Sequence, residues 1–95
     1  MLKRIPGRGW LVLIGGGEFS FGETAEIDQA WLQKIGDGPI GFLPTASCSA
    51  DYFHHFADYL EEGFGRKVEL IPVYRGRDAR REKNAERVAR CSAVY

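Results

Sequence analysis

The most constraining feature of this sequence is a short apolar run that ends in three glycines. Trp10-Leu11-Val12-Leu13-Ile14 leads directly into Gly15-Gly16-Gly17, and Glu18 follows. A continuous apolar run of this length is typical of a strand that is buried on both faces, as in a parallel sheet. Glycines permit a sharp turn at the carboxyl end of such a strand, which is the edge where open α/β sheets bind ligands. We therefore expect residues 10–14 to bring the chain to a functional edge.

The remaining chain alternates between strand-like and helix-like segments. We expect strands at residues 10–14, 40–43, 68–73 and 92–95, with helices at 24–35, from 49 to about 63, and at 79–90. This alternation predicts parallel strands joined by right-handed helical crossovers. The expected fold class is α/β, a three-layer doubly wound and mainly parallel sheet, preceded by an irregular lead-in over residues 1–9.

Helical periodicity identifies the residues that should face the sheet. The predicted stripes are Ile27, Trp31 and Ile35 in the first helix; Phe53, Phe56, Ala57 and Leu60 in the second; and Ala85, Val88 and Ala89 in the third. We expect Trp31 and Phe56 to be buried.

Turn and cap residues predict where the helices begin and end. Ser49 is a good N-cap for the second helix, and Gly63 or Gly65 should end that helix. Gly36 should cap the first helix, because a proline follows at residue 39 and prevents continuation.

The length and the last residues suggest one domain that is not finished. Ninety-five residues allow a single small α/β domain, and Ser92-Ala93-Val94-Tyr95 resembles the start of a fourth strand. We expect residues 1–95 to be the N-terminal portion of a larger domain. The remainder of that domain, or a second copy in a homo-oligomer, would then cover the open edge of the sheet.

Charge and cysteine content restrict which partners and which cellular compartment the sequence favours. Residues 1–65 carry four Lys/Arg and nine Asp/Glu, whereas residues 66–95 carry nine Lys/Arg and four Asp/Glu. Acids interleave with the arginines, which favours a solvated helix face over a nucleic-acid surface. No apolar run reaches the roughly eighteen residues of a membrane span. The apolar run at residues 10–14 is too short for a signal-peptide core, so we expect a cytoplasmic location. Cys48 and Cys91 fit no metal or disulfide pattern, so we expect free thiols.

The glycine loop does not fit the common nucleotide motifs. A dinucleotide fingerprint would need a third glycine where Ser20 stands. A P-loop spacing fits Gly17, Gly22 and Thr24, but Glu23 occupies the position of the phosphate-binding lysine. We expect no cofactor and no nucleoside triphosphate.

Several polar residues remain as candidates for chemistry. Glu18 and Glu23 could bind a cation or act as an acid–base pair, although carboxylates also stabilise helix N-termini. His54 and His55 point about 100° apart on a helix, too far apart for one metal, and pairing with Asp58 and Asp51 is the simpler expectation.

The loop after the second predicted strand carries hydroxyl and thiol groups. Thr45, Ser47, Cys48 and Ser49 follow Pro44 at the carboxyl end of that strand. Ser47 or Cys48 could be a nucleophile, but no G-x-S-x-G elbow surrounds either residue.

Together these segments resemble a known family. Residues 11–18, the Gly41-Phe42-Leu43-Pro44-Thr45-Ala46-Ser47 segment and the helix that starts with Asp51-Tyr52-Phe53 look like the N-terminal half of the peptidase E (aspartyl dipeptidase) and cyanophycinase family of serine peptidases. That resemblance implies a flavodoxin-like fold similar to class I glutamine amidotransferases.

The resemblance implies a function and a set of site residues. The protein would belong to serine peptidases that hydrolyse small acidic peptides or isopeptides, with no catalytic residue and no metal ligand in residues 1–95. Its substrate-binding rim would comprise Gly15, Gly16, Gly17, Glu18, Thr45 and Ser47. The alternative is a non-catalytic α/β module that binds a small ligand or a partner at the Gly15–Gly17 edge. We expect neither nucleic acid nor membrane as a partner.

Overall fold

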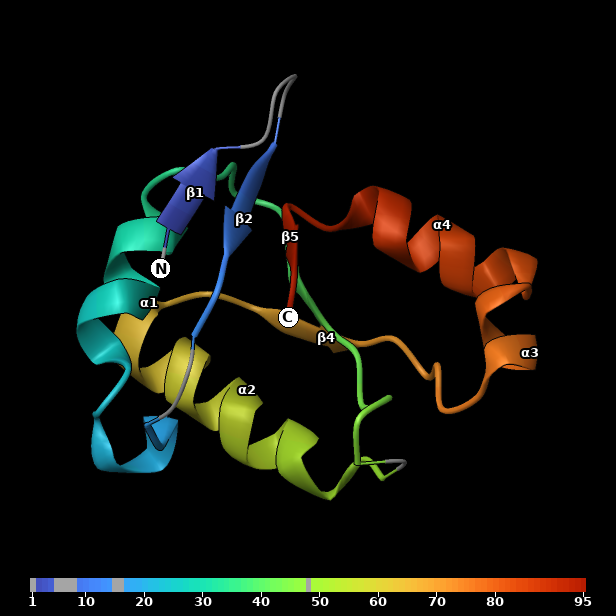
Figure 1. The fold of residues 1–95 in the computed structure, drawn as a ribbon, viewed down its shortest axis with the longest axis horizontal. Coiled ribbons are helices and arrows are strands. Elements are labelled where there is room, and N and C mark those ends of the chain that lie inside the picture. The colour runs from blue at the N-terminus through green and yellow to red at the C-terminus, as the bar shows by residue number, and fades with distance from the viewer. Residues whose placement is uncertain (1, 5–8, 15–16, 48) are drawn as a thin grey trace. The chain divides into compact units, whose positions relative to one another are not determined.

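The computed structural model describes residues 2–4, 9–14, 17–47 and 49–95 (Figure 1). These residues form two compact units, Met1–Ile35 and Gly36–Tyr95. The second unit confirms the predicted α/β class, because it holds a three-stranded parallel sheet with helices.

The first unit contains a β-hairpin and one helix. Strand β1 (Leu2–Arg4) pairs antiparallel with β2 (Trp10–Val12), with Leu2 opposite Val12. A 3-10 turn at Phe19–Phe21 precedes α1 (Ala25–Leu32). Just after α1, the Lys34 ammonium lies 4.5 Å from the centre of the Trp10 ring. This cation–π contact links the end of the helix to β2.

The prediction for the first strand was wrong in two respects. The strand at Trp10 pairs with a strand inside the expected irregular lead-in, and the pairing is antiparallel. Trp10, Leu11 and Leu13 are 37%, 43% and 50% exposed, so the run is not buried on both faces. The sequence between the two strands is rich in proline and glycine, which favours a chain reversal. Local pairing across that short connection competes with the long-range parallel pairing that we expected.

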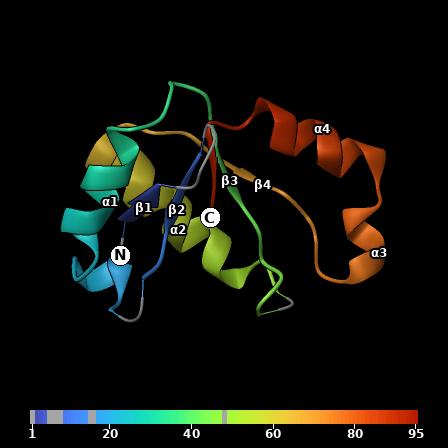
Figure 2. The ribbon, with the colours of Figure 1, turned by 45° about the horizontal axis from the view of Figure 1, so that its top comes forward.

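The second unit is built on a parallel sheet with the strand order β4-β3-β5 (Figure 2). Its strands are β3 (Ile40–Phe42), β4 (Val68–Leu70) and β5 (Ala93–Val94). Ile40 lies opposite both Val68 and Ala93. Between the strands lie α2 (Asp51–Phe64), α3 (Gly76–Ala79) and α4 (Glu82–Arg90). Three of the four predicted strands therefore pair in parallel as expected.

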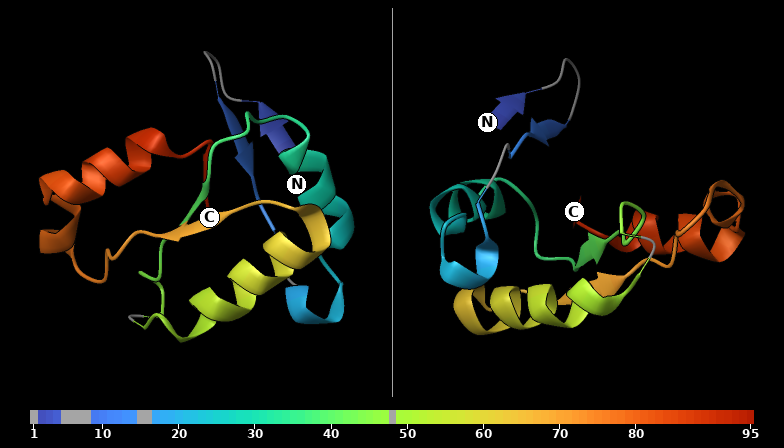
Figure 3. Two further views of the ribbon diagram at one scale, coloured as in Figure 1. Left: turned by 180° about the vertical axis from the view of Figure 1, so that it is seen from behind. Right: turned by 60° about the horizontal axis from the view of Figure 1, so that its bottom comes forward.

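Helix α2 covers one face of this sheet and confirms the predicted second stripe. Phe56 and Leu60 are fully buried, and Ala57 is 8% exposed. The Phe56 ring lies 5.3 Å from that of Phe42 in β3 and stacks at 4.1 Å on Tyr95, which follows β5. In Figure 3, right, the yellow-green α2 runs along the sheet, in agreement with its contacts to β4. This aromatic cluster is the core of the second unit.

The opposite face of the sheet is covered from the α4 side. Side chains alternate along a strand, so position 41 faces away from Phe42. A Cβ atom at Gly41 would lie 2.4 Å from Ile71 Cδ1 and 3.0 Å from Cys91 Sγ, so both side chains pack directly onto the glycine backbone. On the same face, Arg90 of α4 forms a 2.8 Å ion pair with Glu69 of β4. Because Gly41 has no side chain, the chain that follows α4 can pack closely against β3.

The predicted ends of the first two helices are partly right. Helix α1 ends at Leu32 with Gln33 as its C-cap, rather than continuing to Gly36. Helix α2 has Ala50 as its N-cap, although Ser49 Oγ still accepts a 3.2 Å hydrogen bond from the Asp51 N–H. Gly65 ends α2 in the left-handed conformation, with φ of 66°, as one of the two predicted stops. This backbone conformation costs glycine little.

The third helix was predicted over residues 79–90, and this prediction is right only for the part from Glu82 to Arg90. The chain forms the short α3 and then α4, with a break at residues 80–81. The predicted apolar stripe of Ala85, Val88 and Ala89 is exposed, whereas Asn84 is only 2% exposed. The side chain that faces inward is that of Asn84, which donates hydrogen bonds to backbone carbonyls.

In the first unit, Trp31 and Leu32 are buried and Ile27 and Ile35 are partly buried, so the predicted burial of Trp31 is confirmed. None of the helices in the described ranges has the length and apolar character needed to cross a bilayer.

Candidate functional site

The strand order of the second unit identifies one position at the edge of its sheet as a candidate ligand site. The connection through α2 runs from β3 to β4 on one side, and the connection through α3 and α4 returns across β3 to β5 on the other side. Strand β3 is therefore the central strand, and its two neighbours are reached by crossovers that run in opposite directions along the sheet. Crevices at the carboxyl ends of such strands are the usual ligand sites of open parallel sheets. The turn at residues 44–47 follows β3 at this edge.

Thr45 and Ser47 lie in this turn, as the sequence predicted. The Thr45 hydroxyl donates a 2.6 Å hydrogen bond to the carbonyl of Val73, which follows β4. Ser47 Oγ lies 3.0 Å from the carbonyl oxygen of Ser49 and 3.3 Å from that of Pro44, and its single proton can serve one of them at a time. Both side chains are exposed. Hydroxyls held as donors to carbonyls can orient a ligand but are not activated as nucleophiles.

The histidines of α2 do not act on this turn in the described structure. His54 and His55 are exposed, and their contacts are with the rings of Phe53 and Tyr52, at 5.3 Å and 6.3 Å between centroids. The expected pairing with acidic neighbours is wrong, because neither histidine forms an ion pair within the described ranges. Exposed pairs of this kind gain little over hydration.

The glycine loop belongs to the first unit and is described there only from Gly17 onward. Gly15 and Gly16 lie outside the described residues, as does Cys48 of the second unit. Gly17 has a φ of 95°, and a Cβ at this position would lie 3.2 Å from Thr24 Cγ2. Both observations require glycine here. The predicted tight turn at the strand end is therefore present at Gly17.

The two carboxylates of this loop act on the loop itself. The Glu18 N–H donates a 3.2 Å hydrogen bond to Glu23 Oε1, and the Glu23 N–H donates one of 3.2 Å to the Glu18 carbonyl. Glu23 thus closes the segment between the glycines and α1. This contact gives a structural role to the residue that replaces the P-loop lysine.

A buried carboxylate supports the same segment from the helix. Asp28 is fully buried and accepts hydrogen bonds of 2.8 Å from the Thr24 hydroxyl and from Trp31 Nε1. A Cβ atom at Gly17 would lie 3.2 Å from Thr24 Cγ2, so Thr24 packs directly against this glycine. A buried carboxylate must be hydrogen-bonded, and here its bonds hold the first turn of α1 against the loop.

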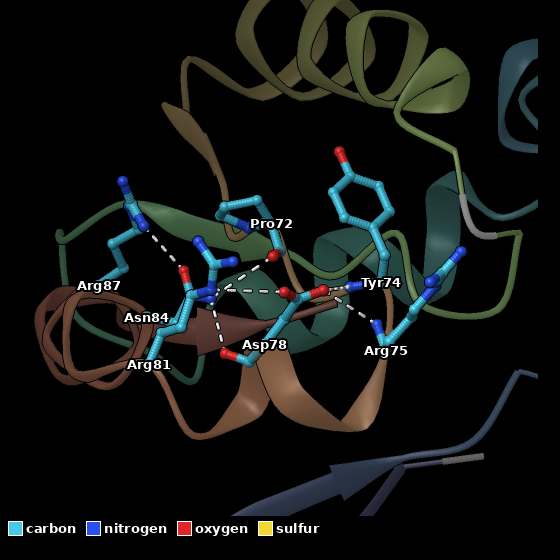
Figure 4. A network of polar contacts seen from close by, with 7 residues as sticks. All are labelled: Pro72, Tyr74, Arg75, Asp78, Arg81, Asn84 and Arg87. Atoms are coloured by element: carbon cyan, nitrogen blue, oxygen red, sulfur yellow. Dashed lines mark hydrogen bonds and ion pairs between the residues drawn. The ribbon is translucent and has the colours of Figure 1, made fainter.

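A polar network that the sequence patterns did not predict lies between β4 and α4 (Figure 4). Asp78 Oδ2 accepts the N–H groups of Tyr74 and Arg75 at 3.0 Å and 3.1 Å, and these bonds are the main reason that the pKa of Asp78 lies below its usual value. Arg81 Nε lies 3.5 Å from Asp78 Oδ1. The carboxylate therefore orders the backbone after β4 and attracts one arginine.

Asn84 is the buried centre of this network. Its side-chain nitrogen donates to the carbonyls of Asp78 and Pro72 at 2.9 Å and 3.4 Å, and its oxygen accepts a 2.7 Å bond from Arg87. The only signal in the sequence is the spacing of Asp78, Arg81, Asn84 and Arg87, which are three residues apart. Residues three apart are neighbours on a helix, but Asp78 lies in α3 and Asn84 and Arg87 lie in α4, so the break between the helices brings the four together.

Cys91 is a poor candidate for a nucleophile. Burial is the first cause, and the nearby Glu69 carboxylate the second, of a pKa above the ordinary value of the thiol. The thiol donates a 3.1 Å hydrogen bond to the Arg87 carbonyl. A protonated and partly buried thiol of this kind is inert compared with a thiolate.

Comparisons with known proteins add no assignment. No family model, curated protein or solved structure matches this chain. Among the described residues, no group of three or more His, Cys, Asp or Glu side chains is placed to hold a metal ion.

Proposed function

We propose that residues 1–95 supply the substrate-binding rim of a serine-type peptidase or related amide hydrolase that acts on small acidic peptides or isopeptides. In this proposal the sheet of the second unit is part of a doubly wound, flavodoxin-like sheet of the class I glutamine amidotransferase type. The nucleophile comes from an elbow that these residues do not contain, because no G-x-S-x-G segment occurs among them.

The observation that carries the proposal is the position of the turn at residues 44–47. The strand order β4-β3-β5 makes β3 the central strand, so this turn follows it at the carboxyl edge where parallel sheets usually bind ligands. Its Pro-Thr-Ala-Ser sequence is also part of the resemblance to the peptidase E and cyanophycinase family. The Ser47 hydroxyl is exposed at this edge. It can accept a hydrogen bond from a substrate N–H or donate one to a substrate carbonyl.

The alternative function is a non-catalytic module that binds a small ligand. One observation favours it: the hydroxyls of Thr45 and Ser47 donate to backbone carbonyls, and serine catalysis instead needs a base that accepts the serine proton. In this alternative the ligand contacts the loop around Gly17 in the first unit.

Titration of the 95-residue chain with an aspartyl dipeptide, followed by amide NMR and by amine release, tests the proposal. We expect saturable shifts at residues 44–49, no amine release, and weaker binding by the Ser47→Ala variant. Shifts confined to residues 17–24 would instead support the binding module. Amine release that survives Ser47→Ala but is lost in His55→Ala would contradict the proposed site and move the chemistry to α2.

A further inference from the structure

The network around Asn84 holds two arginine side chains whose cations are only partly used. Arg87 donates to Asn84 through one terminal nitrogen, and Arg81 approaches Asp78 through Nε. Within the described residues, the remaining N–H groups of these two guanidinium groups make no hydrogen bond. A guanidinium carries five N–H donors, so most of the donor capacity of both groups remains available.

Both arginines are oriented by groups that are themselves fixed. Asn84 is 2% exposed and is tied to the carbonyls of Pro72 and Asp78. The Asp78 carboxylate is held by two backbone N–H groups. Figure 4 shows Arg87 bonded to the Asn84 side chain, and Arg81 next to Asn84 and Asp78. The 2.7 Å bond to buried Asn84 therefore restricts Arg87 before a ligand binds, whereas Arg81, with a side chain 68% exposed, is drawn to the site by the Asp78 charge.

The charge around this pair favours an anion with more than one negative charge. Arg77, Arg80 and Lys83 are exposed within a few residues of Arg81. Glu82 and Glu86 are the acids of α4 in this stretch. Among the described residues, neither carboxylate forms an ion pair with Arg81 or Arg87. Asp78 offsets one positive charge, which leaves the surface around Asn84 basic.

We propose that Arg81 and Arg87 form a clamp for a phosphate group of a small ligand. Two guanidinium groups can each give paired N–H donors to different oxygens of a phosphate, whereas one carboxylate is satisfied by one such group. The clamp lies on the α4 side of the chain segment that follows β4. This inference is independent of the peptidase proposal, which concerns the turn after β3.

Binding of inorganic pyrophosphate to the 95-residue protein, measured by calorimetry at low ionic strength, tests the clamp. We expect saturable binding that weakens at least tenfold in Arg81→Gln and in Arg87→Gln. The matched control is Arg80→Gln, which removes the same charge at an exposed position and should weaken binding less than threefold. Arg87→Lys retains the charge but should still lose affinity severalfold, because lysine cannot bind two oxygens in one plane.

Two further measurements separate the clamp from a general electrostatic effect and from misfolding. Pyrophosphate should shift the Asn84 side-chain amide and the Arg81 and Arg87 Nε resonances, and each variant should keep the circular dichroism spectrum of the parent. An equal loss in Arg80→Gln, or no saturable binding, would overturn the proposal. Tight binding of a single-stranded octanucleotide that pyrophosphate does not displace would overturn it as well, and would indicate a nucleic-acid surface.

Discussion

The Thr45 hydroxyl and the Val73 carbonyl are joined by a 2.6 Å hydrogen bond across 28 residues of sequence. The bond ties the turn after β3 to the segment after β4, so it shapes the edge at which the proposed substrate would bind. Its donor is exposed, which limits the free energy that its loss can cost.

Removal of this bond is the first test. Thr45→Val keeps the shape of the side chain but leaves the Val73 carbonyl without this donor. We expect the free energy of unfolding to fall by about 0.5–1.5 kcal/mol in urea denaturation. Ser47→Ala is the comparison, because its hydroxyl contacts only carbonyls of its own turn, and its loss should cost less than that of the Thr45 hydroxyl. Equal losses in both variants would show that the bond does not connect the two segments.

The aromatic core predicts a large effect at Phe56. This side chain is fully buried between Phe42 and Tyr95, so Phe56→Ala should cost about 3–5 kcal/mol of unfolding free energy. Tyr52→Ala on the same helix is the matched control, because Tyr52 is 52% exposed. Its cost should be below about 1 kcal/mol. A denaturation midpoint unchanged by Phe56→Ala would mean that α2 packs through another face.

Two glycine-to-alanine substitutions should change the stability of the protein in opposite directions. Gly41→Ala places a methyl group against Ile71 and Cys91 and should destabilise the protein by about 1–3 kcal/mol. Gly63→Ala lies in α2 with no atom near its Cβ and should stabilise by about 0.5–1 kcal/mol. Thermal and urea unfolding of both variants provide the comparison.

The cause of the Gly41 effect can be checked with a double variant. Ile71→Val removes the Cδ1 atom that lies nearest to the added methyl group. The Gly41→Ala/Ile71→Val protein should therefore lose less stability than the two single losses together. A simple sum would show that the clash at Cδ1 is not the cause.

Asp78 makes stability depend on pH in the acid range. Hydrogen bonds from the Tyr74 and Arg75 N–H groups lower its pKa in the folded protein below the unfolded value of 3.8. The stabilisation is therefore complete above the unfolded pKa and is lost as the pH falls through the lower folded pKa. Asp78→Asn should reduce stability at pH 7, and the difference from the parent should shrink toward pH 2.

A direct measurement of the same effect is an NMR titration of the Asp78 carboxyl carbon, which should give a midpoint below 3.8. A midpoint for Asp78 at or above 3.8 would contradict the hydrogen bonds to its carboxylate.

Local patterns in the sequence determined much of the second unit. The stripe that contains Phe56 and Leu60 predicted the buried face of α2, because helical spacing alone brings these side chains to one side. Gly65 could be predicted as a stop for a similarly local reason, since glycine tolerates the left-handed conformation. The strands at Ile40, Val68 and Ala93, and the position of Thr45 and Ser47 at a strand end, also followed from short apolar segments and their boundaries.

Tertiary structure decided what those patterns leave open. The apolar run at Trp10 does not specify its partner, and the chain reverses to pair it antiparallel with β1 instead of placing it in the parallel sheet. The inward side of α4 was also not predictable from hydrophobicity, because Asn84 is buried to satisfy the carbonyls of Pro72 and Asp78. Pairing partners and buried polar groups depend on atoms distant in sequence or on the breaks between helices. These interactions contribute to the free energy of folding only when the tertiary structure brings the atoms together.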